Sequence, residues 1–357
     1  MPHQQDHAKP ATIREVAARA GVSTATVSRS LRGGAGVEPA TRQRVEDAAR
    51  ALRYRPSGVA RSLKLRATST VGLIVTDIEN PYFPQIVSAV EDAARERGYT
   101  VLLADGRRDP DRELQSLDIL AEREVDGMII ASTAVSRRHH ERIGELTCPT
   151  VIVNSESTVP GVPAVMSDNV MGGRLAAEHV LELGHRAIVF VGDDDDLNSA
   201  VQARIKGART AVSEHSGEEV SFRAVASVGI GDGSVEGGIR AARELVAESF
   251  AETAILSRND LTAIGVMRGL IDAGLRVPQD ISVVGYDDIE LAAYVDPALT
   301  TVRQSTEVMA RLAVANLFER LGHARGAADG EAEASPGETT RVPVELVRRA
   351  SSGPAPG

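Results

Sequence analysis

The order of apolar and polar residues changes its period along the chain. Near the amino end, apolar residues recur at the spacing of one helix face: Ile13, Val16, Ala17 and Ala20. From Val71 onward, short apolar runs alternate with longer amphipathic stretches, as in strands that alternate with helices. The pattern predicts a small helical region followed by a larger α/β region.

The helical region begins with two helices joined by a tight turn. Thr12 and Glu15 have capping-box spacing, and Gly21 supplies the backbone freedom that a turn after a helix requires. Ser23 is a candidate N-cap for the second helix, in which Val27 and Leu31 face inward. This arrangement predicts a helix-turn-helix, and an ordinary helical hairpin is the alternative that the pattern alone leaves open.

The second helix presents small polar residues and arginine on its outer side. At about 100° per residue, the outward and first-turn positions are Thr24, Ala25, Ser28, Arg29 and Arg32. A third helix is predicted over about Pro39–Leu52, with inward residues Val45, Ala48, Ala49 and Leu52. After a disordered tail (1–11), these helices predict a DNA-binding headpiece over residues 1–55.

The run AxxAGVSxxTVSRxL at Ala17–Leu31 resembles the DNA-reading headpiece of the lactose-repressor (LacI/GalR) family of bacterial regulators. The likeness continues through Val37–Arg66 to the carboxyl end. Where family members usually begin the third helix with a Ser cap, this chain has Glu38–Pro39. The resemblance implies DNA contacts from Thr12, Ser23, Thr24, Ala25, Thr26, Ser28, Arg29 and Arg32.

The stretch PSGVARSLK (56–64), within a predicted hinge and linker at 56–69, resembles the family's hinge helix. Composition alone favours a plain linker. The resemblance implies that two copies pair across a homodimer, or a higher oligomer, and enter the minor groove of near-palindromic double-stranded DNA. Leu63 would then be a wedge between base pairs, with Ala60 and Lys64 beside it as DNA contacts.

Charge is distributed unevenly between the two regions. Residues 1–66 hold 13 Lys or Arg and 5 Asp or Glu, a net of +8, whereas the whole chain carries −10 and the remainder therefore −18. A basic head on an acidic body suits a protein that touches phosphates with one end. Cys148 is the single cysteine, and neither a secretory signal nor a membrane-spanning run is found, so we expect a protein of the bacterial cytoplasm.

The second region predicts an α/β fold with parallel sheets in two similar subdomains, which resemble periplasmic sugar-binding proteins. The predicted strands are Val71–Thr76, Thr100–Ala104, Gly127–Ala131, Thr150–Asn154, Ala187–Gly192, Thr253–Ser257 and Ile281–Tyr286. The predicted helices are Gln85–Arg97, Asp111–Arg123, Gly172–Leu183, Ala203–Glu214, Val235–Ala247 and Leu261–Ala273.

The family's topology implies an effector-binding and dimerisation core at 70–350, with chain crossings near Asp168, Thr300 and Pro343. The first subdomain then covers 70–167 plus 299–325, and the second covers 168–298 plus 341–350. Residues 324–340 have low complexity and are predicted to be a flexible insertion.

Polar groups that follow the strands predict an effector site in the cleft between subdomains, where open α/β sheets bind ligands. The candidates are Tyr82, Phe83, Asn154, Asn198, Arg204, Asn259, Asp260 and Asp287. Each taken alone reads as a cap or turn residue; together they match family positions that bind effectors, and their groups suit the hydroxyls of a sugar. Some relatives stack an aromatic ring near position 230, where this chain has Ile230, and it contains no Trp.

The other motifs in the sequence do not indicate a catalytic site, a cofactor site or a metal site. Asp193–Asp196 reads as a solvated loop, His139–His140 as an exposed helix face, and GIGDGS (229–234) fails the dinucleotide pattern. The sequence therefore predicts a transcriptional repressor controlled by a small molecule, a sugar, that either loosens or tightens DNA binding. The alternative is a sugar-binding carrier or sugar-processing enzyme on the same core, but a carrier needs an export signal and an enzyme a catalytic motif.

Overall fold

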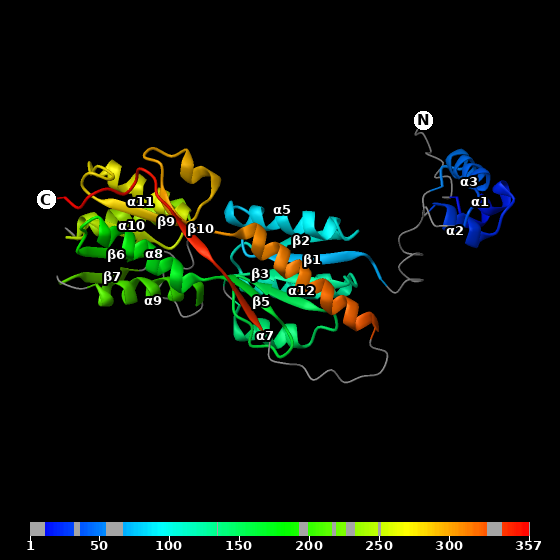
Figure 1. Ribbon diagram of the computed structural model, residues 1–357, viewed down its shortest axis with the longest axis horizontal. Coiled ribbons are helices and arrows are strands. Elements are labelled where there is room, and N and C mark those ends of the chain that lie inside the picture. The colour runs from blue at the N-terminus through cyan, green and yellow to red at the C-terminus, as the bar shows by residue number, and fades with distance from the viewer. Residues whose placement is uncertain are drawn as a thin grey trace, which may run out of the picture. The chain divides into compact units, whose positions relative to one another are not determined.

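The computed structural model describes residues 11–31, 36–54, 67–133, 135–192, 199–215, 219–225, 233–248, 251–326 and 338–356. The chain forms two units, Met1–Thr68 and Ser69–Gly357, called here the headpiece and the core. Figure 1 shows the helices of the headpiece in blue and the two α/β subdomains of the core in the remaining colours.

The headpiece contains the helices α1 (Ile13–Ala20), α2 (Thr24–Leu31) and α3 (Pro39–Ala51). Their contact is centred on Val16, Val27 and Val45, all fully buried. Burying one such side chain contributes roughly 1.5–3 kcal/mol, so a few of them hold a small unit together. Ser30 is buried as well and Leu31 only half-buried, which corrects the prediction that Val27 and Leu31 alone face inward.

Local signals set the ends of the first two helices as predicted. The Thr12 N–H donates to Glu15 Oε2 at 2.6 Å and the Glu15 N–H donates to Thr12 Oγ1 at 3.4 Å, which is the capping box. Gly21 has φ 65°, a left-handed backbone that ends α1. The Thr26 N–H donates to Ser23 Oγ at 3.1 Å and so caps α2.

The first sheet of the core has six strands in the order β11-β5-β4-β3-β1-β2. All its pairings are parallel. Strands such as β3 are buried on both faces, which explains their continuous apolar sequences. The strands are β1 (Thr70–Val75), β2 (Thr100–Asp105), β3 (Gly127–Ala131), β4 (Thr150–Val153), β5 (Ala164–Ser167) and β11 (Thr339–Val342).

The second sheet repeats this plan in the order β12-β10-β9-β8-β6-β7. Its strands are parallel except β12, which is antiparallel to β10. The predicted class, α/β with two mostly parallel sheets, is confirmed. The strands are β6 (Ala187–Val191), β7 (Ser221–Val225), β8 (Ala254–Ser257), β9 (Ser282–Asp287), β10 (Thr300–Gln304) and β12 (Val344–Val347).

Helices cover both sheets. The first subdomain contains α5 (Tyr82–Arg95), α6 (Pro110–Glu122), α7 (Arg137–Gly144) and α12 (Thr306–Gly326); the second contains α8 (Asn169–Glu182), α9 (Ser199–Glu214), α10 (Val235–Ala247), α11 (Asp260–Asp272) and the 3-10 helix η1 (Glu290–Ala293). The orange α12 runs beside α5 (Figure 1). Helices α8 and α9 touch at Gly173, where a Cβ would lie 1.9 Å from the Arg204 carbonyl oxygen.

The chain crosses between the subdomains at Asp168, Ser305 and Pro343. Gln304 pairs with Val344 in the β10–β12 ladder, so the second and third crossings lie side by side. This corrects the predicted boundaries. Residues 300–304 belong to the second subdomain because β10 pairs with β9, and residues 339–342 belong to the first because β11 pairs with β5.

The seven strands predicted from apolar runs are present, each with ends within one residue of the prediction. The prediction did not include five strands, β5, β7, β10, β11 and β12, nor the helix α12 and the 3-10 helix η1; it placed His139–His140 on a helix, which is α7, without giving its bounds. Helix α12 buries Met309, Ala313, Leu317 and Leu321, at helical spacing, against α5 and the first sheet. The predicted insertion 324–340 overlaps the end of α12 and the start of β11; residues 327–337 are outside the described ones.

His139 corrects another expectation. It lies on α7 as a fully buried side chain, with Nε2 3.4 Å from Glu113 Oε2 of α6, whereas the sequence predicted an exposed helix face at His139–His140. His140 is half-buried. The Nδ1 of His139 lies 2.8 Å from the Ser136 hydroxyl oxygen, and a helical pattern cannot reveal a neighbour such as Glu113, which is 26 positions earlier in the chain.

Candidate functional site

The outer side of α2 in the headpiece carries the residues predicted to read DNA. Thr24, Ala25 and Arg29 are exposed, and Ser28 is half-buried. Ser23 and Thr26 are engaged with each other at the helix start, with their hydroxyl oxygens 2.9 Å apart. A helix with an exposed arginine and small neighbours can approach base edges in the major groove without steric conflict.

Other predicted contacts with DNA or effector fall outside the described residues. These are Arg32, Ala60, Leu63, Lys64 and Asn198. The predicted solvated loop Asp193–Asp196 also lies outside the described residues. Thr12 is described, and its amide and hydroxyl both bond to the Glu15 carboxylate.

In the core, two predicted effector residues of the first subdomain meet. Tyr82 begins α5 after β1, and Asn154 follows β4 with φ 70°. The Tyr82 hydroxyl donates to Asn154 Oδ1 at 2.6 Å. Both side chains are buried, with exposed fractions of 3% and 5%. The carboxyl ends of these strands therefore bring together groups that are 72 positions apart.

Gln304 joins this pair to the second subdomain. Its Nε2 donates to Asp287 Oδ1 at 2.6 Å, and its Oε1 lies 3.4 Å from the Tyr82 hydroxyl. Sequence reasoning missed Gln304 because it assigned the region to a crossing; its position at the end of a strand was the signal that could have found it. Tyr82, Asn154, Arg204, Asp287 and Gln304 are called the interdomain network below.

Arg204 enters the interdomain network from α9. Its Nε donates to Asn169 Oδ1 at 2.9 Å, and its Nη1 donates to the backbone carbonyl of Arg258. The guanidinium carbon lies 3.5 Å from the centre of the Tyr286 ring, a cation–π contact. Arg204 is thus fixed by three partners, and its charge acts on Asp287 and Tyr82.

Burial controls the proton affinity of these groups. It raises the pKa of Asp287 to about 6, although the Arg204 charge, the Gln304 hydrogen bond and Arg258 act in the opposite direction. Burial also raises the pKa of Tyr82 above its usual range and that of Tyr286 to about 12. Both phenols therefore stay neutral near pH 7 and can donate, whereas Asp287 is largely an acceptor.

The remaining predicted residues also make contacts within the fold. Asn259 Oδ1 caps α11 by accepting from the Thr262 N–H at 2.9 Å, and its Nδ2 donates to the Gly233 carbonyl. Asp260 is fully buried and accepts from the Thr301 hydroxyl and from the Ile289 N–H. Its pKa is raised, first by burial and then by the Asp287 charge. Phe83 packs in the hydrophobic core of the first subdomain.

Several buried polar atoms near these strand ends have no hydrogen-bond partner among the described residues. They are Asn154 Nδ2, Ser257 Oγ at the end of β8, and the Tyr286 hydroxyl at the end of β9. Buried groups of this kind are costly unless something pairs with them, so such atoms at adjacent strand ends point to a hydrogen-bonding ligand. Asn154 and Tyr286 lie in different subdomains.

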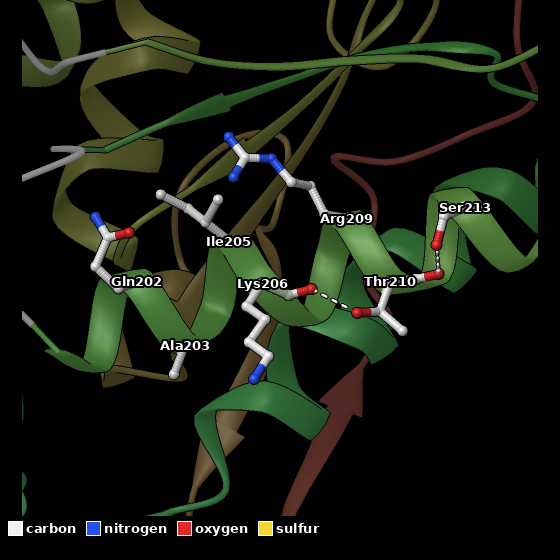
Figure 2. A pocket seen from close by; sticks show the side chains of 7 residues that line it. All are labelled: Gln202, Ala203, Ile205, Lys206, Arg209, Thr210 and Ser213. Atoms are coloured by element: carbon white, nitrogen blue, oxygen red, sulfur yellow. Dashed lines mark hydrogen bonds between the residues drawn. The ribbon is translucent and has the colours of Figure 1, made fainter.

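A separate hollow of about 580 Å³ lies on the outside of α9. Figure 2 shows that its lining side chains lie along one helix: Gln202, Ala203, Ile205, Lys206, Arg209, Thr210 and Ser213. The Thr210 and Ser213 hydroxyls donate to carbonyls of that same helix. The lining contains none of the predicted effector residues that the structure describes, and the convergent polar groups are those of the interdomain network.

The described residues hold no group of three or more His, Cys, Asp or Glu side chains that could bind a metal ion. Within the same residues, no helix is long and apolar enough to cross a membrane.

Comparison with known sequences follows the two-unit division. A family model described as bacterial regulatory proteins, lacI family, matches residues 12–57, and a model described as periplasmic binding protein-like domain matches residues 177–352. The ribose operon repressor of Escherichia coli (strain K12) is 34% identical over 87% of this chain and 93% of its own length. The HTH-type transcriptional repressor PurR of Mannheimia succiniciproducens is 34% identical over 96% of this chain and 98% of its own.

Solved structures give the same result. The Lac repressor dimer bound to operator and the anti-inducer ONPF matches with a TM-score of 0.81 and 28% identity, over 97% of this chain and 100% of the repressor. A LacI family transcriptional regulator from Enterococcus faecium with bound ribose matches with a TM-score of 0.68 and 29% identity, over 80% of this chain and 99% of the regulator. The headpiece and the core thus both have counterparts in DNA-binding regulators.

Proposed function

This chain belongs to the lacI family of bacterial regulatory proteins, and we propose that it is a transcriptional repressor whose affinity for operator DNA is controlled by a sugar held at the interdomain network. It acts as a homodimer on a near-palindromic operator and has no catalytic role. Because its partner is chromosomal DNA, it works in the bacterial cytoplasm.

The headpiece supplies the DNA half of this function. The exposed Arg29 on α2 reads guanine, since its fork of donors matches two acceptors on that base. Thr24 and Ala25 allow the helix to approach. One headpiece of this size covers too little DNA for specific binding, so two copies read the two half-sites.

A sugar fits the interdomain network better than a flat base. Asp287 offers carboxylate acceptors, and Asn154 offers an amide donor without a partner among the described residues. Hydroxyl groups, which both donate and accept, match this set. Stacking on a base needs a free ring face, yet Tyr82 and Phe83 are only 3% exposed and Arg204 covers the Tyr286 ring.

The same geometry explains how a sugar influences DNA binding. Asn154 belongs to the first subdomain and Asp287 to the second, so a ligand that bonds to both favours the arrangement in which they are close. The subdomains continue into each other at three crossings, and the first subdomain follows the headpiece directly in the chain, at Ser69. The coupling between sugar binding and DNA binding then equals the difference in sugar affinity between two arrangements of the subdomains.

The observation that carries the proposal is the convergence of Tyr82, Asn154, Gln304 and Asp287 from both subdomains. The test is fluorescence anisotropy with labelled DNA from upstream of the protein's own gene, titrated with and without D-ribose and a panel of other pentoses, hexoses and purines. We expect tight binding whose midpoint shifts with one sugar. An unchanged midpoint with every sugar and a shift with a purine would overturn the sugar assignment.

A further inference from the structure

We propose that Arg349, in the segment after the last strand, is a positioning residue for the sugar site: it holds Asp288 and thereby orients Asp287. The inference rests on the proposed role of Asp287 in sugar binding. Arg349 itself belongs to no part of the interdomain network. It lies 62 positions after Asp287 and contacts Asp288 from outside that network.

The backbone at the end of β9 needs such support. Asp287 has φ 120° and Asp288 has φ 56°, both in the region that side-chain-bearing residues rarely adopt. Conformations of this kind persist only where the surrounding structure fixes them, and they gather at ligand sites. With this backbone, the Asp287 carboxylate accepts a hydrogen bond from Gln304, and its charge acts on Tyr82.

Two arginines donate hydrogen bonds to the carboxylate of Asp288. Arg349 Nη2 donates to Asp288 Oδ1 at 2.6 Å, and Arg303 Nε donates to Asp288 Oδ2 at 2.6 Å. The Asp288 side chain is only 8% exposed, and Arg349 is 18% exposed, whereas Arg303 is 47% exposed. The bond to Arg349 is the less solvated of the two and is therefore the stronger constraint.

Arg349 is itself held firmly. Its backbone N–H donates to Thr300 Oγ1 at 2.9 Å, and its Nη1 donates to the Leu299 carbonyl at 2.8 Å. Two residues later, the Ser351 hydroxyl accepts from the Thr300 N–H and donates to the Val283 carbonyl. Because these bonds fix Arg349 against β9 and β10, its guanidinium holds the Asp288 carboxylate in a fixed position.

A second contact fixes the other end of the turn. The Ile289 N–H donates to the buried Asp260 at 2.9 Å. When Arg349 is removed, this contact and the exposed Arg303 remain, so the turn stays folded but the pair Asp287–Asp288 can rotate. The expected result is a loss of sugar affinity without a loss of the fold.

The chain offers a matched control in the adjacent residue. Arg348 pairs with Glu182 at 2.9 Å, and both side chains are more than 60% exposed. The variants are Arg349→Gln and the control Arg348→Gln in the full-length protein. Arg349→Lys keeps the charge and one donor for Asp288, and serves as the rescue variant.

Two measurements test the inference. Hydrogen exchange of the sugar-free protein should be faster at residues 286–290 in Arg349→Gln only, with a melting temperature close to the parent's. Calorimetry with D-ribose as the probe should show at least about tenfold weaker binding for Arg349→Gln, and near-parent binding for Arg348→Gln and Arg349→Lys. In the double variant of Arg349→Gln and Asp287→Asn, the loss of ribose affinity should be smaller than the sum of the two single losses, because Arg349 acts on the sugar through the Asp287 side chain.

Unchanged exchange at 286–290 in Arg349→Gln, or ribose losses that add fully to those of Asp287→Asn, would overturn the inference. If Arg349→Gln does not fold, Asp288→Asn breaks the same contact and takes its place in both measurements. Failure of D-ribose to bind the parent counts against ribose as the effector, whereas the exchange measurement still decides the role of Arg349.

Discussion

Replacing Asp287 with asparagine removes the charge at the interdomain network while keeping its shape. The amide oxygen of asparagine can still accept from Gln304 Nε2, a bond of 2.6 Å in the parent. Asparagine also tolerates positive φ better than most residues, which matters because Asp287 has φ 120°. The variant therefore tests the carboxylate rather than the fold.

The size of the effect follows from the bond that is lost. A hydrogen bond to a charged acceptor contributes about 1.5–3 kcal/mol, and each 1.4 kcal/mol is tenfold in affinity, so sugar binding should weaken about 10- to 150-fold. Operator affinity without sugar should stay near the parent's, because the headpiece is a separate unit. A sugar that no longer binds cannot shift the operator midpoint at the parent's concentration.

The same variant should lose a pH dependence. Burial raises the pKa of Asp287 to about 6, so the carboxylate that accepts sugar hydroxyls predominates above pH 6 and disappears below it. Parent affinity should therefore fall about tenfold per pH unit below 6, and Asp287→Asn should show a flat profile. Asp280→Asn is the control: pairing with Arg276 lowers the pKa of Asp280 to about 2, outside this window.

The contribution of Asp287 to the stability of the sugar-free protein should change with pH in the opposite direction from its contribution to sugar affinity. The folded protein holds the Asp287 proton more tightly than the unfolded chain, so this group's contribution to unfolding free energy is largest below pH 3.8 and falls as the pH rises to about 6. A shift of about two units corresponds to roughly 3 kcal/mol. Without sugar at pH 7, Asp287→Asn should thus melt higher than the parent.

The assay is calorimetry with the effective sugar from pH 5 to 8, with scanning calorimetry of the sugar-free proteins alongside. Parent-like affinity in Asp287→Asn, or a pH dependence that survives the substitution, would refute the assignment of Asp287 to the site. A lower melting temperature at pH 7 would refute the argument from burial.

Three further predictions concern other parts of the chain. Operator affinity should fall steeply with salt, with a slope in log K of about −0.9 per phosphate neutralised, because residues 1–66 carry +8; a flat titration would contradict this. Arg29→Ala should relax base preference by about 1–3 kcal/mol at one position of each half-site, whereas Arg19→Ala on α1 should not; binding-site selection distinguishes them. Asp260→Ala should cost about 2 kcal/mol or more in urea unfolding, because the Ile289 N–H and Thr301 hydroxyl lose their acceptor; an unchanged midpoint would show that these bonds do not stabilise the core.

The parts of the molecule that the sequence predicts well are those governed by near neighbours. The capping box of Thr12 and Glu15 and the turn at Gly21 involve residues three or fewer positions apart, or a single residue's φ. The buried strands carry continuous apolar runs because helices cover both faces of each sheet. Such signals need no knowledge of the tertiary structure.

The parts that escaped prediction depend on partners far along the chain. Gln304 meets Asp287 and Tyr82 only because β10 lies beside β9 and ends near α5. His139 is buried because α7 packs beside Glu113 of α6. Asp260 accepts from the Thr301 hydroxyl and the Ile289 N–H, partners 41 and 29 positions away that the local sequence does not indicate. Short edge strands such as β11 and β12 have too few residues for a clear period.

The order in which the two sheets are completed has a consequence for synthesis on the ribosome. The first sheet lacks β11 until residue 342 has emerged, and the second lacks β12 until residue 347 has emerged. Neither subdomain can therefore finish folding while most of the chain is still being translated, and both wait with unpaired strand edges. The headpiece core, by contrast, closes within residues 13–54, so a nascent chain presents a folded DNA-reading unit long before it can sense a sugar.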